Sequence, residues 1–285
     1  MFIYKQYTQE ALDRQYNNRL QVPEFATYLD QWELKSRQTE KQYPVIQNIA
    51  YGNHTREFLD VYPSPMPYSK TLIFIHGGYW QRFDKSMFQF VAGAFHHYNI
   101  TTVILNYPLA PAVSMDGIVS SCRKTVLWLR DNLSGFNGDA NHLYVAGHSA
   151  GAHLMAMLMA SEWQPGNPGI GTEIFKGACA LSGLFNLVPV QLSEVNQGLQ
   201  MDASTALKNS PVLLKPHIQC PLILAVGGTE TGEFKDQSRE LYTCWKEIIP
   251  ASLSQLSELN HFSILDALCD PTTALHNNLR QLMKV

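Results

Sequence analysis

A serine that could act as a nucleophile lies in the pentapeptide Gly147-His148-Ser149-Ala150-Gly151. The apolar run LYVA precedes this pentapeptide and the helical run AHLMAMLMA follows it, which predicts a sharp turn from a strand into a helix. Such a turn needs small neighbours because its backbone is strained and a bulky side chain would clash. The start of the helix adds N–H groups and a partial positive charge beside the hydroxyl. The pattern is typical of a serine presented for nucleophilic attack at the end of a strand.

Two adjacent glycines lie in the run His76-Gly77-Gly78-Tyr79-Trp80, directly after the apolar run TLIFI. Glycine lets the backbone approach a substrate closely and turn its N–H groups toward it. We therefore expect an oxyanion hole built from the N–H groups of Gly78 and Tyr79, with Gly77 as a further candidate donor. The N–H of Ala150 would join them from the nucleophile turn. Donors fixed in advance around a developing oxyanion lower the barrier by about 3 kcal/mol each where this has been tested.

The serine needs a base whose pKa is near neutrality, and histidine supplies one. His261, in ELNHFSILDAL, follows the last candidate strand and begins a helical run. The other nine histidines lie in loops, on helices or beside the two motifs above, at His54, His76, His96, His97, His142, His148, His153, His217 and His276. In hydrolases with a nucleophile at a strand-to-helix turn, the triad follows the order serine, acid, histidine along the chain. That order, together with its position after the last strand and at the start of a helical run, selects His261.

Three carboxylates follow the strand candidate PLILAVGG and could orient His261: Glu230, Glu233 and Asp236. Glu230 is nearest the strand end, where a side chain is held most rigidly. Glu233 and Asp236 belong to the start of a helix, whose dipole they could simply complement. We favour Glu230 as the acid and keep the other two as alternatives. Its task would be to fix the imidazole tautomer and to stabilise the imidazolium.

The elements that must position these residues alternate along the chain. Eight short β-rich runs are seen at residues 45–52, 56–63, 71–78, 101–108, 142–149, 176–183, 221–228 and 251–258. Helical stretches separate the later runs, at residues 84–98, 115–133, 150–163 and 233–248. This alternation predicts an α/β fold with a mostly parallel, doubly wound sheet of about eight strands. Such sheets bind ligands outside the carboxyl ends of their strands, where Gly78, Ser149 and Glu230 follow their strands and His261 comes after the last strand.

We expect one domain over residues 1–285, because this length still allows a single large core. Apolar residues at helical spacing predict a helical N-terminal arm over about 1–40, with two helices joined near Pro23. Residues about 185–217 contain no clear strand pattern, which suggests a helical cap inserted over the site. A homodimer is compatible with the sequence.

The composition narrows the classes of function. A net charge of -3 gives no basic excess for nucleic-acid binding. No run approaches the roughly 18 apolar residues that span a membrane, and the first residues contain no signal-peptide core, so a cytoplasmic location without membrane contact is expected. The five cysteines are scattered, and no HxxxH or HExxH pairing is present, which disfavours a metal site. We predict reduced cysteines and no metal or organic cofactor.

Several motifs together resemble the kynurenine formamidase (arylformamidase) branch of the hormone-sensitive-lipase-like α/β hydrolases. These are YNNR, LDVY, HGGYW, NYPLAP, GHSAGAHL, LSGLFNL, NSP, VGGTETGEF and NHFSIL, which extend over nearly the whole chain. The form HGGxW in place of HGGG separates this branch from ordinary lipase-like esterases. The resemblance implies an α/β-hydrolase fold and places the acid at Glu230, where animal members usually carry an aspartate.

The resemblance also implies hydrolysis of N-formylkynurenine to kynurenine and formate, in tryptophan catabolism, through an acyl-enzyme on Ser149. A formyl group suits a small acyl pocket, and the aromatic amine needs an apolar pocket. Tyr79, Trp80, Phe185 and Phe262 are candidates to line that pocket, although Trp80 could instead pack the loop. The first alternative is a carboxylesterase acting on short-chain or aryl esters. A binding protein without catalysis is a remote alternative, because a serine, a histidine and an acid are all present.

Overall fold

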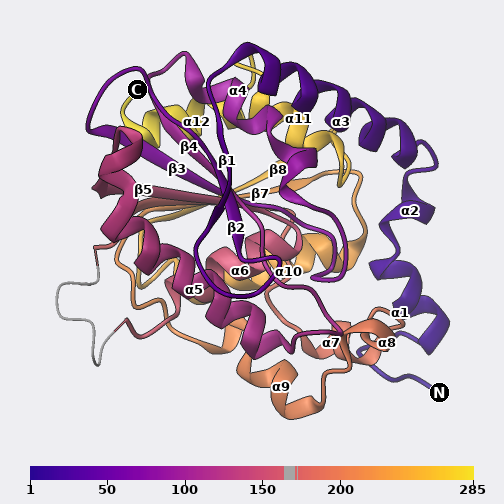
Figure 1. Ribbon diagram of the computed structural model, residues 1–285. Coiled ribbons are helices and arrows are strands. Elements are labelled where there is room, and N and C mark those ends of the chain that lie inside the picture. Colours follow the sequence, from indigo (N-terminus) through magenta and orange to yellow (C-terminus); the bar gives the residue numbers. More distant parts are fainter. Residues whose placement is uncertain (164–170, 172) are drawn as a thin grey trace.

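The protein is built around one twisted eight-stranded sheet (Figure 1), and the computed structural model describes residues 1–163, 171 and 173–285. The strands are β1 (Ile46–Ala50), β2 (Phe58–Tyr62), β3 (Ser69–Ile75), β4 (Thr101–Leu105), β5 (Gly138–His148), β6 (Phe175–Leu181), β7 (Leu222–Gly227) and β8 (Ala251–Leu256). Their order in the sheet is β1-β2-β4-β3-β5-β6-β7-β8. β2 is antiparallel to β1 and β4, and all later pairs are parallel. The predicted mostly parallel sheet of about eight strands is confirmed, and the fold is that of an α/β hydrolase.

The central strands are buried on both faces, which explains their continuous apolar runs. In β3, Leu72 and Phe74 join the core on one face of the sheet, and Ile73 and Ile75 join the core on the other. Of the edge strands, β1 is mostly exposed and β8 is partly buried, and both are more polar than the central strands. The loops that follow the central strands are therefore anchored to a rigid, well-packed support.

Helices cover both faces of the sheet, in two layers that Figure 1 shows above and below it. The core of one face contains residues of α5 (Met115–Asn132), α6 (Ala150–Met159) and α10 (Gly232–Trp245). The core of the other face contains residues of α3 (Phe25–Gln42), α4 (Phe90–His96), α11 (Ser263–Cys269) and α12 (Ala274–Met283). Two of the connections also contain short 3-10 helices, η1 (Lys85–Phe88) and η2 (Leu133–Phe136).

Helix α5 illustrates how the sequence produces this layer. The hydroxyl of Ser114 accepts from the N–H of Gly117 and so caps the first turn. Ile118, Cys122 and Val126 recur every four residues and are buried on one face of the helix. The helix thus begins at a capping residue and packs its apolar stripe onto the sheet.

The N-terminal arm contains three helices rather than the two expected. They are α1 (Gln9–Tyr16), α2 (Asn18–Gln21) and α3. The chain leaves helical geometry at Asn17, whose side chain accepts from the N–H of Leu20 and caps α2. Pro23 lies between α2 and α3, where the break was expected. Figure 1 shows α1 beside α7 and α8, and α3 running along α4 and α11.

Residues 188–213 form a group of short helices at the carboxyl end of the sheet. These are α7 (Val188–Leu192), α8 (Asn196–Leu199), α9 (Ala203–Lys208) and the 3-10 helix η3 (Pro211–Leu213). In the part of the chain that the structure describes, no helix is long and apolar enough to cross a membrane.

Candidate active site

Ser149 occupies the turn between β5 and α6, with φ 56° and ψ −119°. A positive φ is unusual for a residue with a side chain and marks a strained turn. The N–H of Ser149 donates to the carbonyl of Leu181 at 2.8 Å, which ties the turn to β6. A Cβ at Gly151 would lie 2.0 Å from the carbonyl oxygen of Ile75, and one at Gly147 would lie 2.3 Å from that of Gly151. The small neighbours expected on sequence grounds are therefore a steric requirement.

A chain of hydrogen bonds connects Ser149, His261 and Glu230. The Oγ atom of Ser149 lies 3.1 Å from Nε2 of His261, and Nδ1 of His261 lies 2.7 Å from Oε2 of Glu230. A carboxylate only accepts, so Nδ1 carries the proton and Nε2 is free to accept from the serine hydroxyl. All three side chains are buried. The arrangement allows His261 to take the serine proton directly.

The carboxylate of Glu230 is held by two further donors. Its Oε1 atom accepts from the hydroxyl of Ser182 at 2.5 Å and from the N–H of Gly227 at 2.7 Å. The ring of Phe234 packs against the imidazole of His261, with 4.6 Å between the ring centroids. Both the acid and the base are thus fixed in orientation by groups that lie outside the reacting centre.

The two alternative acids lie elsewhere. Glu233 is buried, but its carboxylate pairs with the ammonium of Lys5 at 3.0 Å, and the Tyr16 hydroxyl donates to it at 3.3 Å. Burial raises the pKa of Glu233. Asp236 is partly exposed and pairs with Lys5 and Arg239. The structure therefore brings Glu230 to His261 and places the other two carboxylates against the N-terminal arm and the helix surface.

The loop after β3 presents backbone N–H groups beside Ser149. Gly78 has φ 106°, and a Cβ there would lie 2.5 Å from the carbonyl oxygen of Arg82, so only glycine fits. Tyr79 and Trp80 also have positive φ, at 52° and 58°. Within the described ranges, the N–H groups of Gly78, Tyr79 and Ala150 donate to no other protein group. Unpaired donors of this kind are what an oxyanion hole requires.

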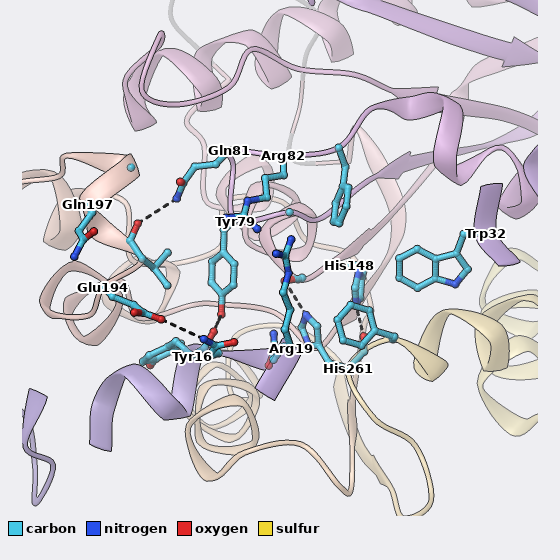
Figure 2. Close-up of a pocket in the computed structure, with 18 of the residues that line it drawn as sticks. Tyr16, Arg19, Trp32, Tyr79, Gln81, Arg82, His148, Glu194, Gln197 and His261 are labelled. Atoms are coloured by element: carbon cyan, nitrogen blue, oxygen red, sulfur yellow. Dashed lines mark hydrogen bonds between the residues drawn. The ribbon is translucent and has the colours of Figure 1, made fainter. Parts of the chain in front are cut away.

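The side chain of Tyr79 ties this loop to the N-terminal arm. Its hydroxyl donates to the carbonyl of Tyr16 at 2.6 Å. The arm is thereby connected directly to a residue of the candidate oxyanion hole, and Figure 2 shows the Tyr79 side chain reaching Tyr16.

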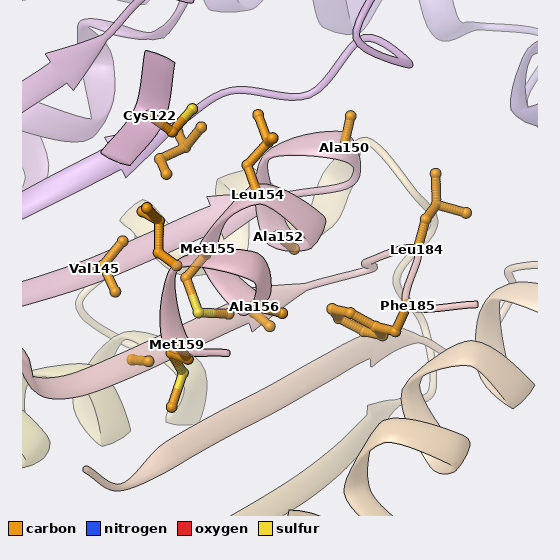
Figure 3. Packing of buried hydrophobic residues seen from close by; sticks show 14 of the residues in the cluster. Cys122, Val145, Ala150, Ala152, Leu154, Met155, Ala156, Met159, Leu184 and Phe185 are labelled. Atoms are coloured by element: carbon orange, nitrogen blue, oxygen red, sulfur yellow. The ribbon is translucent and has the colours of Figure 1, made fainter. Parts of the chain in front are cut away.

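Two of the aromatic residues expected in the substrate pocket are instead in the core. Trp80 is fully buried, and its indole N–H donates to Nδ1 of His153 at 3.1 Å. Phe185 is also fully buried within the core on the α6 side of the sheet (Figure 3). The indole N–H of Trp80 is hydrogen-bonded and both rings are shielded from solvent, so Trp80 and Phe185 do not line the cavity. Phe262 and Tyr79, the other two candidates, do line it.

A cavity of about 450 Å³ opens in front of Ser149 and His261. The arm contributes Tyr16, Asn17, Asn18, Arg19 and Trp32 to its wall. The loop after β3 adds Gly78, Tyr79, Gln81, Arg82 and Phe83, and the segment around α8 adds Glu194, Val195, Gln197 and Gly198. The motif YNNR at residues 16–19 was the one sign in the sequence that the arm has a part in this site.

Three buried histidines surround the site in neutral form. Burial lowers the pKa of His76 and His153 to about 4, and lowers that of His148 well below its usual range. His148 donates from Nε2 to the carbonyl of His261 at 2.8 Å, and His153 donates from Nε2 to that of Asn209 at 2.8 Å. These rings support the backbone of the site.

The buried histidines predict that the protein loses stability in mild acid. Below pH 6.5 the unfolded chain takes up protons at these positions and the folded chain does not, so the free energy of unfolding falls as the pH falls toward 4. The expected loss is about 2 kcal/mol per histidine between pH 7 and pH 5, measured by urea unfolding. His153→Gln should flatten this slope, and the exposed control His217→Gln should not. Equal free energies at both pH values would contradict the prediction.

In residues 1–163, 171 and 173–285, no three histidine, cysteine, aspartate or glutamate side chains converge as a metal site. The five cysteines are all unpaired.

Comparisons with known proteins show which family the chain is similar to. The family model BD-FAE matches residues 59–178. The kynurenine formamidase of Salmo salar is 34% identical over 245 residues, which are 83% of this chain and 81% of the fish protein. That of Danio rerio is 33% identical over 256 residues, 86% of this chain and 85% of its own. A solved structure of a candidate thioesterase from Silicibacter sp. TM1040 has a TM-score of 0.83 at 26% identity, covering 96% of this chain and 99% of that chain. The resemblance seen in the motifs is confirmed, and the chain is a hydrolase that belongs to the kynurenine formamidase family.

Proposed function

We propose that this hydrolase cleaves N-formylkynurenine to kynurenine and formate through a formyl-enzyme on Ser149. The observation that carries the proposal is the hydrogen-bonded chain from Ser149 through His261 to Glu230, which opens into a cavity beside unpaired N–H groups. The names of the two fish relatives support the choice of substrate.

The reaction begins when Oγ of Ser149 attacks the formyl carbon and Nε2 of His261 takes the hydroxyl proton. The carbonyl oxygen becomes an oxyanion, which the N–H groups of Gly78, Tyr79 and Ala150 stabilise. His261 then donates its proton to the nitrogen of the departing aromatic amine as the carbon–nitrogen bond breaks. Water attacks the formyl ester in the second half, with His261 again as base, and formate leaves as the serine regains its proton.

The walls of the cavity suit an aromatic leaving group. Trp32 and Phe262 line it, with 6.0 Å between their ring centroids, and Phe88 lies behind them. These rings offer an apolar surface on which an aniline ring can pack. The site opposite them, between Ser149 and the glycine loop, needs to hold only a hydrogen and an oxygen of the formyl group.

The test is to measure kcat/KM on N-formyl-L-kynurenine and on p-nitrophenyl acetate with the same purified protein. We expect the formamide to be preferred by at least about tenfold, although esters are intrinsically easier to cleave, because binding energy from the leaving group is used in the transition state. A preference for the acetate would leave the proposed catalytic groups in place and make the protein a carboxylesterase.

A further inference from the structure

Two guanidinium groups line the cavity without an anionic partner. Arg19 comes from α2 and Arg82 from the loop after β3, and both line the cavity that contains Ser149. Over the described ranges, neither side chain donates a hydrogen bond or joins an ion pair. The guanidinium carbon of Arg19 lies 5.0 Å from the centroid of the Phe25 ring.

The remaining arginines of the chain show that this is unusual. Five are in ion pairs with carboxylates: Arg14, Arg37, Arg56, Arg130 and Arg239. Arg123 and Arg280 donate to backbone carbonyls. Each of the other seven guanidinium groups therefore has at least one oxygen atom of the protein as a partner. The two without such a partner in the described ranges face the same cavity.

The two positive charges also act on each other. Burial, and then the charge of Arg82, lower the pKa of Arg19. An arginine keeps its proton in proteins, so this repulsion is an unfavourable interaction that a bound anion would relieve. A planar carboxylate matches two guanidinium groups especially well, since each can donate two parallel hydrogen bonds.

A negative charge lies elsewhere in the same wall. Glu194 lines the cavity, and one of its oxygens accepts from the side-chain amide of Asn17 at 3.3 Å. No cation pairs with Glu194 in the part of the chain described. In the view of Figure 2, Glu194 lies on one side of Tyr79 and Arg19 on the other. The wall thus offers separate positive and negative positions beyond the reacting centre.

We propose that Arg19 and Arg82 bind the carboxylate of the substrate and that Glu194 binds its ammonium group, so that the site selects formamides with an α-amino-acid head group. The proposal rests on the function proposed above. With the formyl group at Ser149 and the aryl ring packed against Trp32 and Phe262, the amino-acid end of the leaving group would extend toward these charged side chains, which line the same cavity. The head group would then select the substrate without taking part in bond breaking.

The experiment compares three formamides: N-formyl-L-kynurenine, its deamino analogue, and the ortho-formamide of acetophenone, which has neither charge. In the double variant Arg19→Gln, Arg82→Gln we expect kcat/KM to fall about 10- to 100-fold for the two substrates with a carboxylate, mainly through KM. For the neutral formamide, kcat/KM of the double variant should differ by less than about twofold from that of the unmodified protein. In Glu194→Gln, kcat/KM should fall about tenfold for N-formylkynurenine and should not change for the deamino analogue. Arg37→Gln, on the outer surface of α3, is the matched control and should alter none of the three.

Failure of the head-group proposal and failure of the proposed function would give different results in this experiment. An unchanged kcat/KM of the double variant on N-formylkynurenine, or an equal loss on the charged and neutral formamides, would overturn the head-group proposal while the proposed function stands. Failure of the unmodified protein to cleave any of the three formamides, with p-nitrophenyl acetate still cleaved, would overturn the proposed function and this proposal with it.

Discussion

Replacing Ser149 by alanine is expected to lower kcat by roughly 10⁴- to 10⁶-fold, with the protein still folded. The substitution removes the attacking oxygen and keeps the Cβ, and the hydroxyl bonds only to His261 within the described residues. Any residual rate would come from the N–H donors and the binding of the substrate. The measurements are kcat on N-formyl-L-kynurenine and on p-nitrophenyl acetate, together with the melting temperature.

Covalent labelling gives an independent check of the same prediction. A fluorophosphonate should label the unmodified protein and the control Ser120→Ala, which changes an exposed hydroxyl on α5. It should not label Ser149→Ala. Labelling of this variant, or turnover near the rate of the unmodified protein, would show that another residue is the nucleophile.

Replacing Glu230 by glutamine should lower kcat by about 10³- to 10⁴-fold. Glutamine has nearly the same shape, but its amide carries no charge to stabilise the imidazolium and can present a donor to Nδ1 of His261. The ring would then favour the tautomer with a proton on Nε2, which cannot accept from Ser149. The measurement is kcat on N-formyl-L-kynurenine, with KM expected to change little.

The competing carboxylates are the matched controls for this prediction. Asp236→Asn alters an ion pair at the surface and should keep kcat within a few-fold of the unmodified value. Glu233→Gln loses its pair with Lys5 and should mainly reduce stability. If kcat fell as far in Glu233→Gln as in Glu230→Gln, the assignment of Glu230 as the acid would be wrong.

The parts of the site that could be predicted from the sequence are those fixed by local structure. Ser149, Glu230 and His261 each follow a strand, and parallel strands end at one edge of a sheet, so their proximity follows once the strands are recognised. The choice of Glu230 over Glu233 also rested on distance from a strand end. The structure brings together the three residues that this reasoning favoured.

Other parts depend on tertiary packing, and the most that the sequence showed of them was the motif YNNR at residues 16–19. Arg19 and Trp32 reach the cavity only because the arm docks against the far end of the chain. Trp80 and Phe185 have the size and polarity of pocket residues, but the direction of a side chain in a loop depends on backbone angles. Trp80 has φ 58°, which turns the indole into the core, while its neighbour Tyr79 faces the cavity. Composition and spacing do not contain these angles.

The long-range contacts of the N-terminal arm determine at which stage of synthesis the active site is completed. Its polar contacts join residues more than 200 positions apart, such as Lys5 with Glu233 and Lys35 with Asp266. A ribosome delivers the arm long before α10 and α11, so these contacts form only after the later helices are made, although α3 can already pack on α4 and η1. The wall that holds Arg19 and Trp32 is therefore completed at about the same time as His261 becomes available. Chemical reactivity and substrate selection would then arise together at the last stage of synthesis, and a growing chain would not hydrolyse bystander esters or amides.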